Sequence, residues 1–413
     1  MMMMMHHEEK REQLIKLKNE KHAKKNGDPL CVVCIYKAST SMQRQFIRFL
    51  KTKSSQFYAK STISPLAFKL QPPSSFTPQS ALIFSTPTNL PQIIEDVIEL
   101  HQKHSLQVVV AGIDTMVPSS SRNGVSELWL DHRMKIANSL LLEERDDLNT
   151  PPPESDGINP VTARKNWKNL QGHLSLKLRH EMDAKISLAN TVFSTGSILT
   201  LFYFDAETNA AHSGQHLCEL EVALPRGVVP NHATAKIEDK WTPLYPGKLF
   251  KITNCVGNLL KSIDKNPAAK YLENNEQLMS LKSKDTEVFV KLRKRGSTIV
   301  ERFKVTAGGG GWGAKADIIA LSPEAKPERG DEIEFFMVTP DDRFVKQKDD
   351  AVERFNQTFA FMSSYEETGY GNDDTDSQVE RVYETFGCGS EQGFFFNGVK
   401  HHSPGEIVYI KFK

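Results

Sequence analysis

The sequence predicts a mixed fold in which helices accompany β-sheets, and three observations point to it. Residues 81–112 have the pattern of a strand, a helix and a second strand, which is a β-α-β unit. Strand-like apolar runs recur at 191–204 and 217–224. After Gly and Pro residues that continue to Pro246, a new series of short strands begins, so we expect a second module there.

The β-α-β unit is the most regular of these elements. Residues 81–86 form a short apolar strand, and Pro87 introduces the helix 90–104, with Thr88 or Asn89 as its cap. The apolar positions of the helix repeat at helical spacing, at Ile93, Ile94, Val97, Ile98 and His101. The β-branched run 106–112 completes the unit, and such a crossover most simply joins parallel strands.

The second module contains several short elements. We expect strands at 248–253, 259–263, 288–292, 300–305 and 331–338, a turn at 256–258, and a helix that opens at Pro267. Two polar segments interrupt the strand-rich parts of the chain. Residues 143–160 contain three consecutive prolines and are predicted to be an exposed loop or a disordered insertion. Residues 366–378 are rich in Asp, Gly and Thr and are predicted to be a second loop.

The composition is that of a globular protein. The chain has 413 residues, of which 39% are hydrophobic and 25% charged, which is enough to build a large core without metal or disulfide staples. The mean hydropathy of −0.43 argues against an integral membrane protein, and no transmembrane segment is expected. Five cysteines are an odd number on a long chain, which indicates a reducing compartment.

The net charge of +1 conceals an uneven distribution. Residues 1–41 carry eight basic and five acidic side chains, or +3, and residues 42–94 carry six basic side chains and no acidic one, or +6. The remaining residues 95–413 therefore carry 1 − 3 − 6 = −8. Because an acidic body does not attract phosphate backbones, nucleic acid is not expected as a partner.

The basic N-terminal segment is predicted to be a mitochondrial presequence at residues 42–65. The segment is rich in Arg, Lys and Ser, and on a helix Phe46, Phe49, Leu50 and Phe57 would lie opposite the basic side chains. Residues 1–41 are then a gene-model extension or a disordered segment, with Met42 as the start, and residues 66–80 are a linker. The alternative is a disordered basic arm that binds an acidic partner.

A glycine-rich loop is the candidate site for a ligand or partner. It consists of Gly308, Gly309, Gly310, Gly311, Trp312, Gly313 and Lys315. Four consecutive glycines expose backbone N–H groups and permit positive φ, so the loop could hold an anion or a flat ligand against Trp312. The P-loop spacing is broken at Lys315, which excludes an NTPase. The alternative is a bulged hairpin whose tryptophan packs on the sheet.

No catalytic motif and no metal site are predicted, and no cofactor is expected. Cys388 lies between glycines and His401 and His402 follow, but a small buried thiol is the simpler interpretation. The two histidines would face opposite sides of a strand, so they are a poor metal pair. A single C-x-x-C, at Cys31 and Cys34, supplies only half of a zinc site.

A basic run between residues 164 and 179 is the candidate for a peripheral contact with the inner membrane. It contains Arg164, Lys165, Lys168, Lys177 and Arg179. Such a run is usually a solvated face. Because the body is acidic overall, a local basic patch could instead dock anionic lipid or an acidic subunit.

The second module resembles the opening of the C-terminal half of FIST proteins. The matching residues are Pro246-Gly-Lys-Leu-Phe-Lys-Ile-Thr253, Gly257-Asn258, Ile263-Asp264 and Pro267-Ala268 with Tyr271. The family has a Gly before its Pro-Ala pair, and here Asn266 replaces it, which is a mild change because Asn tolerates left-handed backbone. Residues 328–336, 386–394 and 405–406 are similar to later strands of the family. The resemblance spans roughly residues 80–413.

The resemblance implies an α+β fold with flanking helices and two sheet-containing halves, an N-terminal one at 81–245 and a C-terminal one at 246–413. It also implies a sensory or adaptor role rather than a reaction. With the presequence, it indicates a fungal-type mitochondrial FIST protein in the matrix or on the matrix face of the inner membrane.

Three functions are consistent with these observations. The leading one is a non-enzymatic mitochondrial protein that binds a small ligand or acts as an adaptor to a protein partner, such as a respiratory-chain complex. The second is an enzyme whose catalytic groups are dispersed along the chain. The third is a protein that binds RNA or a membrane surface through its basic N-terminal part.

Overall fold

The computed structural model describes residues 56–142, 171–207, 210–281, 286–308, 317–339, 357–364 and 379–412. All of the described residues belong to one compact unit, which spans residues 55–413. Residues 42–55 of the presequence candidate 42–65, the extension 1–41 with Cys31 and Cys34, and the loop 366–378 lie outside the described residues.

The described chain is mostly β, so the expected α+β fold with flanking helices is wrong. Strands account for 46% of it and helices for 11%. Among the described residues, α3 (Leu90–His104) is the one helix longer than five residues. The others are short: η1 (Pro87–Asn89), α5 (Val192–Thr195), α6 (Lys270–Glu273) and α7 (Glu276–Ser280).

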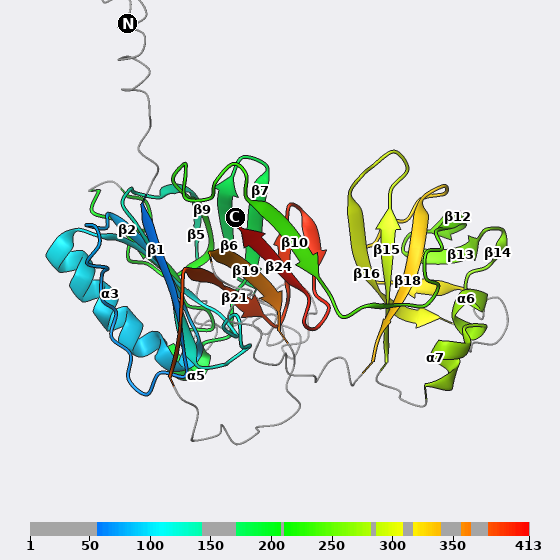
Figure 1. Ribbon diagram of the computed structural model, residues 1–413, viewed down its shortest axis with the longest axis horizontal. Helices are drawn as coiled ribbons and strands as arrows, with labels where there is room; N and C mark the ends of the chain where they lie inside the picture. Colours follow the sequence, from blue (N-terminus) through cyan, green and yellow to red (C-terminus); the bar gives the residue numbers. More distant parts are fainter. Residues whose placement is uncertain are drawn as a thin grey trace, which may run out of the picture. The chain divides into compact units, whose positions relative to one another are not determined.

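Sheet A contains the predicted β-α-β unit. Its strands, in spatial order, are β20 (Glu380–Tyr383), β1 (Phe57–Ile63), β4 (Gly124–Leu130), β2 (Ser80–Ser85), β3 (Gln107–Gly112) and β8 (Leu201–Phe204). Strands β2 and β3 are parallel, as predicted, and α3 crosses over between them. The helix lies against one face of this sheet (Figure 1).

The two faces of sheet A bury alternate residues of the same strands. Leu82 and Phe84 of β2 point into one core, whereas Ala81 and Ile83 pack beneath α3 with Ile93. A strand covered on both faces needs a continuous apolar sequence, which explains the run at 81–84.

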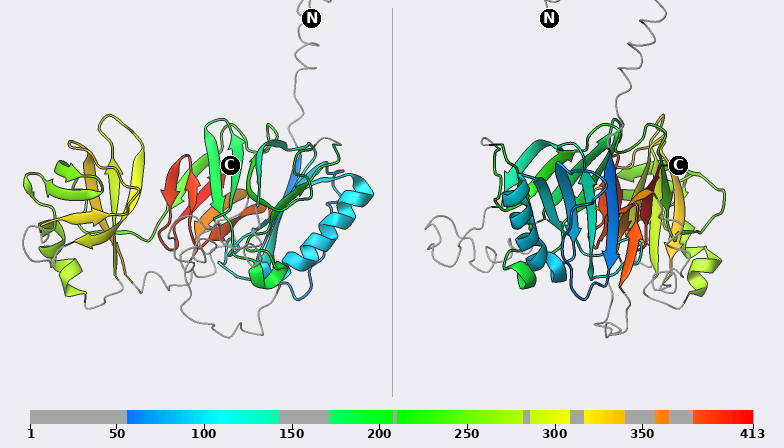
Figure 2. Two further views of the ribbon diagram at one scale, coloured as in Figure 1. Left: turned by 180° about the vertical axis from the view of Figure 1, so that it is seen from behind. Right: turned by 60° about the vertical axis from the view of Figure 1, so that its left-hand side comes forward.

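Two further sheets pack on the face of sheet A away from α3. Sheet B has the order β10 (Thr234–Glu238), β24 (Ile407–Lys411), β19 (Thr358–Ser363) and β21 (Thr385–Ser390). Sheet C has the order β23 (Val399–His401), β22 (Phe394–Phe396), β7 (Met182–Ser187), β6 (His173–Arg179), β9 (Leu217–Ala223) and β5 (Lys135–Leu141). Figure 2 shows these strands on the side of sheet A opposite the helix.

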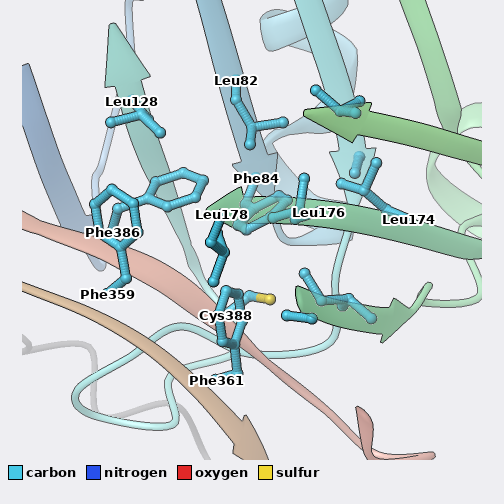
Figure 3. Packing of buried hydrophobic residues seen from close by; sticks show 14 of the residues in the cluster. Leu82, Phe84, Leu128, Leu174, Leu176, Leu178, Phe359, Phe361, Phe386 and Cys388 are labelled. Atoms are coloured by element: carbon cyan, nitrogen blue, oxygen red, sulfur yellow. The ribbon is translucent and has the colours of Figure 1, made fainter. Parts of the chain in front are cut away.

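One shared core joins the three sheets. Phe84 of sheet A stacks on Phe386 of sheet B with 4.7 Å between ring centroids, and Leu176 of sheet C belongs to the same cluster (Figure 3). Cys388 also lies in this cluster. Burial of such a large apolar surface is the main force that holds the sheets together.

Residues 242–338 form a closed ring of strands, which we call the barrel. The ring runs β18 (Glu332–Val338), β12 (Phe250–Val256), β13 (Leu259–Ile263), β17 (Ile319–Leu321), β16 (Val300–Gly308) and β15 (Glu287–Arg293), and β15 pairs back with β18. The short strands β11 (Thr242–Pro243) and β14 (Asn266–Pro267) pair with β18 and β13. Its core is separate from that of the three sheets.

The strands after residue 357 show that the expected arrangement of two sheet-containing halves is wrong. They do not extend the barrel: β20 joins sheet A, β19, β21 and β24 form most of sheet B, and β22 and β23 end sheet C. The barrel is therefore an insertion between strands of one three-sheet body.

The first described strand also changes the prediction for the N-terminal segment. Phe57 begins β1, which pairs with β4 and with β20. Its ring contacts Phe359 and Phe412 edge-on, at 6.2 and 5.7 Å between centroids. Phe57 is thus part of a sheet and not of an amphipathic helix with Phe46.

Candidate functional site

A pocket of about 600 Å³ lies where the edge strand β8 of sheet A meets the edge strand β5 of sheet C. Its lining comes from four stretches of chain: Gln107 of β3, residues 133–139 in and before β5, Tyr203 of β8, and the described residues of 205–212. Pockets of this size hold small metabolites. None of these residues was predicted as a site.

Gln107 lines the pocket and is 1% exposed. Its Oε1 accepts the backbone N–H of Met134 at 2.8 Å, and its Nε2 donates to the Met134 carbonyl at 3.2 Å and to Asp205 Oδ2 at 2.9 Å. Both ends of the amide are therefore fixed. This one side chain connects sheet A, the segment before β5 and the segment after β8.

Asp205 and Arg133 form an ion pair at the pocket wall. The Asp205 side chain is 8% exposed and also accepts the backbone N–H of Glu207 at 3.1 Å and the Gln107 amide. The Arg133 side chain is 33% exposed, and its Nε lies 4.0 Å from Glu207 Oε1. A guanidinium has five N–H donors, so Arg133 keeps donors for a ligand, whereas Asp205 already accepts from Gln107, Glu207 and Arg133.

Hydroxyl and imidazole groups also line the pocket. Ser139 Oγ lies 3.1 Å from His212 Nδ1, and the Tyr203 hydroxyl donates to the Ala211 carbonyl. Burial raises the pKa of the Tyr203 phenol, and the Ser139 hydroxyl lowers it by a smaller amount. Tyr203 therefore stays protonated and keeps an oxygen lone pair that can accept a hydrogen bond.

A bulge shapes the wall formed by β5. The antiparallel register with β9 shifts between Ile136 and Asn138, so Ala137 is an extra residue without a partner in the ladder. Bulges at sheet edges redirect side chains and often lie beside binding sites. All five residues of β5 from Lys135 to Ser139, on both sides of the bulge, contribute to the lining of the pocket.

The charges of the lining cancel. Arg133 and Lys135 are positive and Asp205 and Glu207 are negative, so a strongly charged ligand gains little from the site as a whole. The pocket instead presents hydrogen-bond groups of both kinds: guanidinium donors, the Asn138 amide, and the hydroxyl groups of Ser139 and Tyr203. This arrangement suits a neutral ligand with several hydroxyl or amide groups.

The predicted glycine-loop site lies almost wholly outside the described residues. Gly308 is described: it ends β16 and pairs with Ile319 of β17. A Cβ on Gly308 would lie 3.2 Å from an Ile319 side-chain atom, so the position is closely packed. Gly309, Gly310, Gly311, Trp312, Gly313 and Lys315 are not described, and their role stays a prediction.

The structure explains the glycines around Cys388. A Cβ on Gly387 would lie 1.8 Å from the Ala360 carbonyl oxygen, and one on Gly389 would lie 2.1 Å from Thr115 Oγ1. Cys388 itself is 1% exposed, and burial, followed by the nearby carboxyl of Asp114, raises the pKa of its thiol well above the usual value. A thiol held in this way is a packing residue and a poor nucleophile.

His401 and His402, which the sequence analysis considered as a metal pair, have separate environments. His401 is fully buried, stacks on Phe394 with 5.0 Å between ring centroids, and places Nδ1 2.5 Å from Glu406 Oε1. His402 packs edge-on against Phe289, and burial lowers the pKa of its imidazole. No group of three potential metal ligands is found in the described parts of the chain.

The described part of the basic run does not form a free patch. Lys177 and Arg179 lie on β6, where Lys177 pairs with Glu221. The Arg179 Nη1 group donates to the Pro230 carbonyl at 3.0 Å. Arg164, Lys165 and Lys168 lie outside the described residues, and no described helix is long and apolar enough to cross a membrane.

Comparison with known proteins adds no relative. No protein-family model matches the chain, and neither the curated proteins nor the solved structures contain a match. The FIST resemblance of residues 246–273 therefore stays a prediction.

Proposed function

We propose that this chain is a binding protein whose ligand is a small, polar and uncharged molecule held in the pocket between β5 and β8. The observation that carries the proposal is the set formed by Gln107, Arg133 and Asp205: Gln107 and Asp205 are held by hydrogen bonds, and Arg133 retains free donors beside a cavity of about 600 Å³. Pre-ordered polar groups bind at a smaller entropic cost than flexible ones.

The charge balance of the lining supports the choice of ligand class. A ligand with one net charge would meet an opposite charge and a like charge within the same lining, at Arg133 and Glu207. A polyol, a nucleoside or an amide can instead accept from Arg133 and exchange hydrogen bonds with Asn138 and Ser139.

A second candidate function is an enzyme that uses the pair of Ser139 and His212. Their 3.1 Å separation is within the reach of a hydroxyl nucleophile and its general base. The described contacts of His212 do not include a carboxylate that would orient the ring, which makes binding the better supported of the two functions.

We also propose, from the sequence alone, that the protein is a mitochondrial member of the FIST type and an adaptor to a protein partner. The support is the composition of the segment that starts at Met42 and the resemblance at residues 246–273. Since Phe57 begins a central strand, we place the end of the presequence before it.

The first experiment is a ligand screen. Purified full-length protein would be analysed by native mass spectrometry for bound small molecules. A panel of neutral polyols, nucleosides and amides would then be tested by thermal shift. We expect at least one of them to raise Tm, whereas panels of dicarboxylates and diamines should not. Turnover of a panel compound that is abolished in Ser139→Ala would support the enzyme instead.

A further inference from the structure

A second polar cluster lies where two of the three parallel strand pairs of the described body meet. Strands β2 and β3 are one pair, strands β19 and β21 the other, and both pairs end at this point. Thr115, just after β3, exchanges two backbone hydrogen bonds with Gly389 of β21, at 2.8 and 3.2 Å. Its Oγ1 lies 2.6 Å from Ser364 Oγ, just after β19. We call these contacts the strand-end junction.

Asp114 connects this junction to the turn that follows β21. Its Oδ2 accepts the backbone N–H of Glu391 at 2.9 Å. The Glu391 carboxylate in turn pairs with Arg122, with 2.6 Å between Oε1 and the guanidinium Nη2. The segment 114–122 is thus connected to the turn at 390–393 at both of its ends.

The Asp114 carboxyl has an unfavourable environment when it is ionised. Burial raises its pKa to about 6, and the Glu391 carboxylate adds to the shift, whereas the Glu391 N–H, Arg122 and Ser390 oppose it. Ser390 is 1% exposed, and its hydroxyl lies beside the carboxyl without a well-aligned partner. Among the described residues, the Cys388 thiol is also close enough to Asp114 for the two groups to interact electrostatically.

We propose that the strand-end junction is a proton-operated latch, closed when Asp114 carries a proton and loosened when Asp114 is ionised. A protonated carboxyl still accepts the Glu391 N–H and gains an O–H that can donate to the Ser390 hydroxyl. It also removes the repulsion between Asp114 and Glu391. This proposal is independent of the pocket, to which none of these residues belongs.

The direction of the effect follows from the raised pKa. The unfolded chain releases this proton near pH 4 and the folded chain near pH 6, so the folded state binds the proton more tightly. The stabilisation that the Asp114 proton gives to the folded state is complete below about pH 4 and is lost as the pH rises through about 6. The junction should therefore open more often at neutral pH than at pH 5.

Hydrogen exchange of the full-length protein, read by mass spectrometry, tests the latch. After correction for the intrinsic rate, peptides that cover 113–123 and 388–393 should be about tenfold better protected at pH 5 than at pH 7.5. The variant Asp114→Asn keeps an oxygen for the Glu391 N–H but cannot ionise. The same peptides of this variant should stay well protected from exchange at both pH values.

Glu391→Gln is the second variant, because it keeps the backbone donor and removes the like charge, together with the ion pair to Arg122. It should shift the loss of protection to lower pH, since Asp114 then ionises more readily. Peptides of the barrel, such as 287–293, serve as the internal control and should not respond. Equal pH dependence in wild type and Asp114→Asn would overturn the proposal, as would a loss of protection toward pH 5.

Discussion

Arg302 Nε lies 2.6 Å from Glu406 Oε1, and this buried ion pair connects the barrel to the chain that leads into β24. The same guanidinium pairs with Asp239 and lies 3.9 Å from the centre of the Trp241 ring. Glu406 is fully buried and also contacts His401 Nδ1. The insertion is therefore attached to the body by a compact polar and aromatic contact as well as by its two connecting segments.

Glu406→Gln tests this attachment. Removal of one charge leaves Arg302 partly uncompensated in a buried site, and broken buried pairs cost about 3–5 kcal/mol. We expect a loss of that order in the free energy of unfolding, measured with urea.

The matched control is Glu332→Gln on β18. Glu332 lies 3.6 Å from Arg293, and both side chains are more than 40% exposed. The control should change the free energy of unfolding by less than about 1 kcal/mol. Equal effects of the two substitutions would refute the attachment.

Gly389→Ala tests the close approach at the strand-end junction. The added methyl group would meet Thr115 Oγ1 at 2.1 Å and Ser364 Oγ at 2.5 Å, and neither atom can move without the loss of their mutual hydrogen bond. We expect Tm to fall by several degrees. Thr115→Ala in the same chain removes one clashing atom and should restore part of the loss. A Tm equal to that of wild type for Gly389→Ala would contradict the packing.

The thiol of Cys388 is predicted to be inert in the folded protein. Native protein treated with iodoacetamide at pH 8 should be modified at the half-buried Cys218 and Cys255 before Cys388. Denatured protein should react at all three. Modification of Cys388 in native protein at the rate of Cys218 would show that the site opens or that the thiol is activated.

Two truncations separate the N-terminal segment from the fold. A protein that begins at residue 56 keeps β1 and should unfold cooperatively, with a Tm near that of the full chain. A protein that begins at residue 66 lacks β1 and leaves β4 and β20 without their shared partner, so it should be insoluble or lack a cooperative transition. N-terminal sequencing of the protein from mitochondria should find an end before Phe57. If the two truncated proteins were equally stable, the core would not depend on β1, and the prediction would be wrong.

The β-α-β unit was predictable because its signals are local. The helix 90–104 and the strands on both sides agree with α3, β2 and β3, since apolar periodicity and Pro87 act over a few residues. The prediction of strand structure over residues 191–204 was only partly correct. A helical turn at Val192–Thr195 ends at Gly196 in the left-handed conformation, and the strand begins at Leu201.

The arrangement of strands and the pocket were not predictable in this way. That β19 lies beside β24, and not beside the barrel, depends on pairing between distant segments. The pocket unites Gln107, Arg133 and Asp205, which are up to 98 residues apart and lie in no motif. The one local signal at this site was weak: β5 combines exposed and half-buried residues without regular alternation, as a bulged edge strand does.

The most direct test of the proposed function is a calorimetric titration of a polyol, nucleoside or amide from the screen into two matched variants. Ala137→Phe fills the pocket from the exposed bulge of β5 without a change to the buried polar groups. Ala235→Phe makes the same substitution on the exposed strand β10, which is not part of the pocket. We predict at least about tenfold weaker binding for Ala137→Phe and wild-type affinity for Ala235→Phe. Wild-type affinity in both variants would contradict the assignment of this pocket as the binding site.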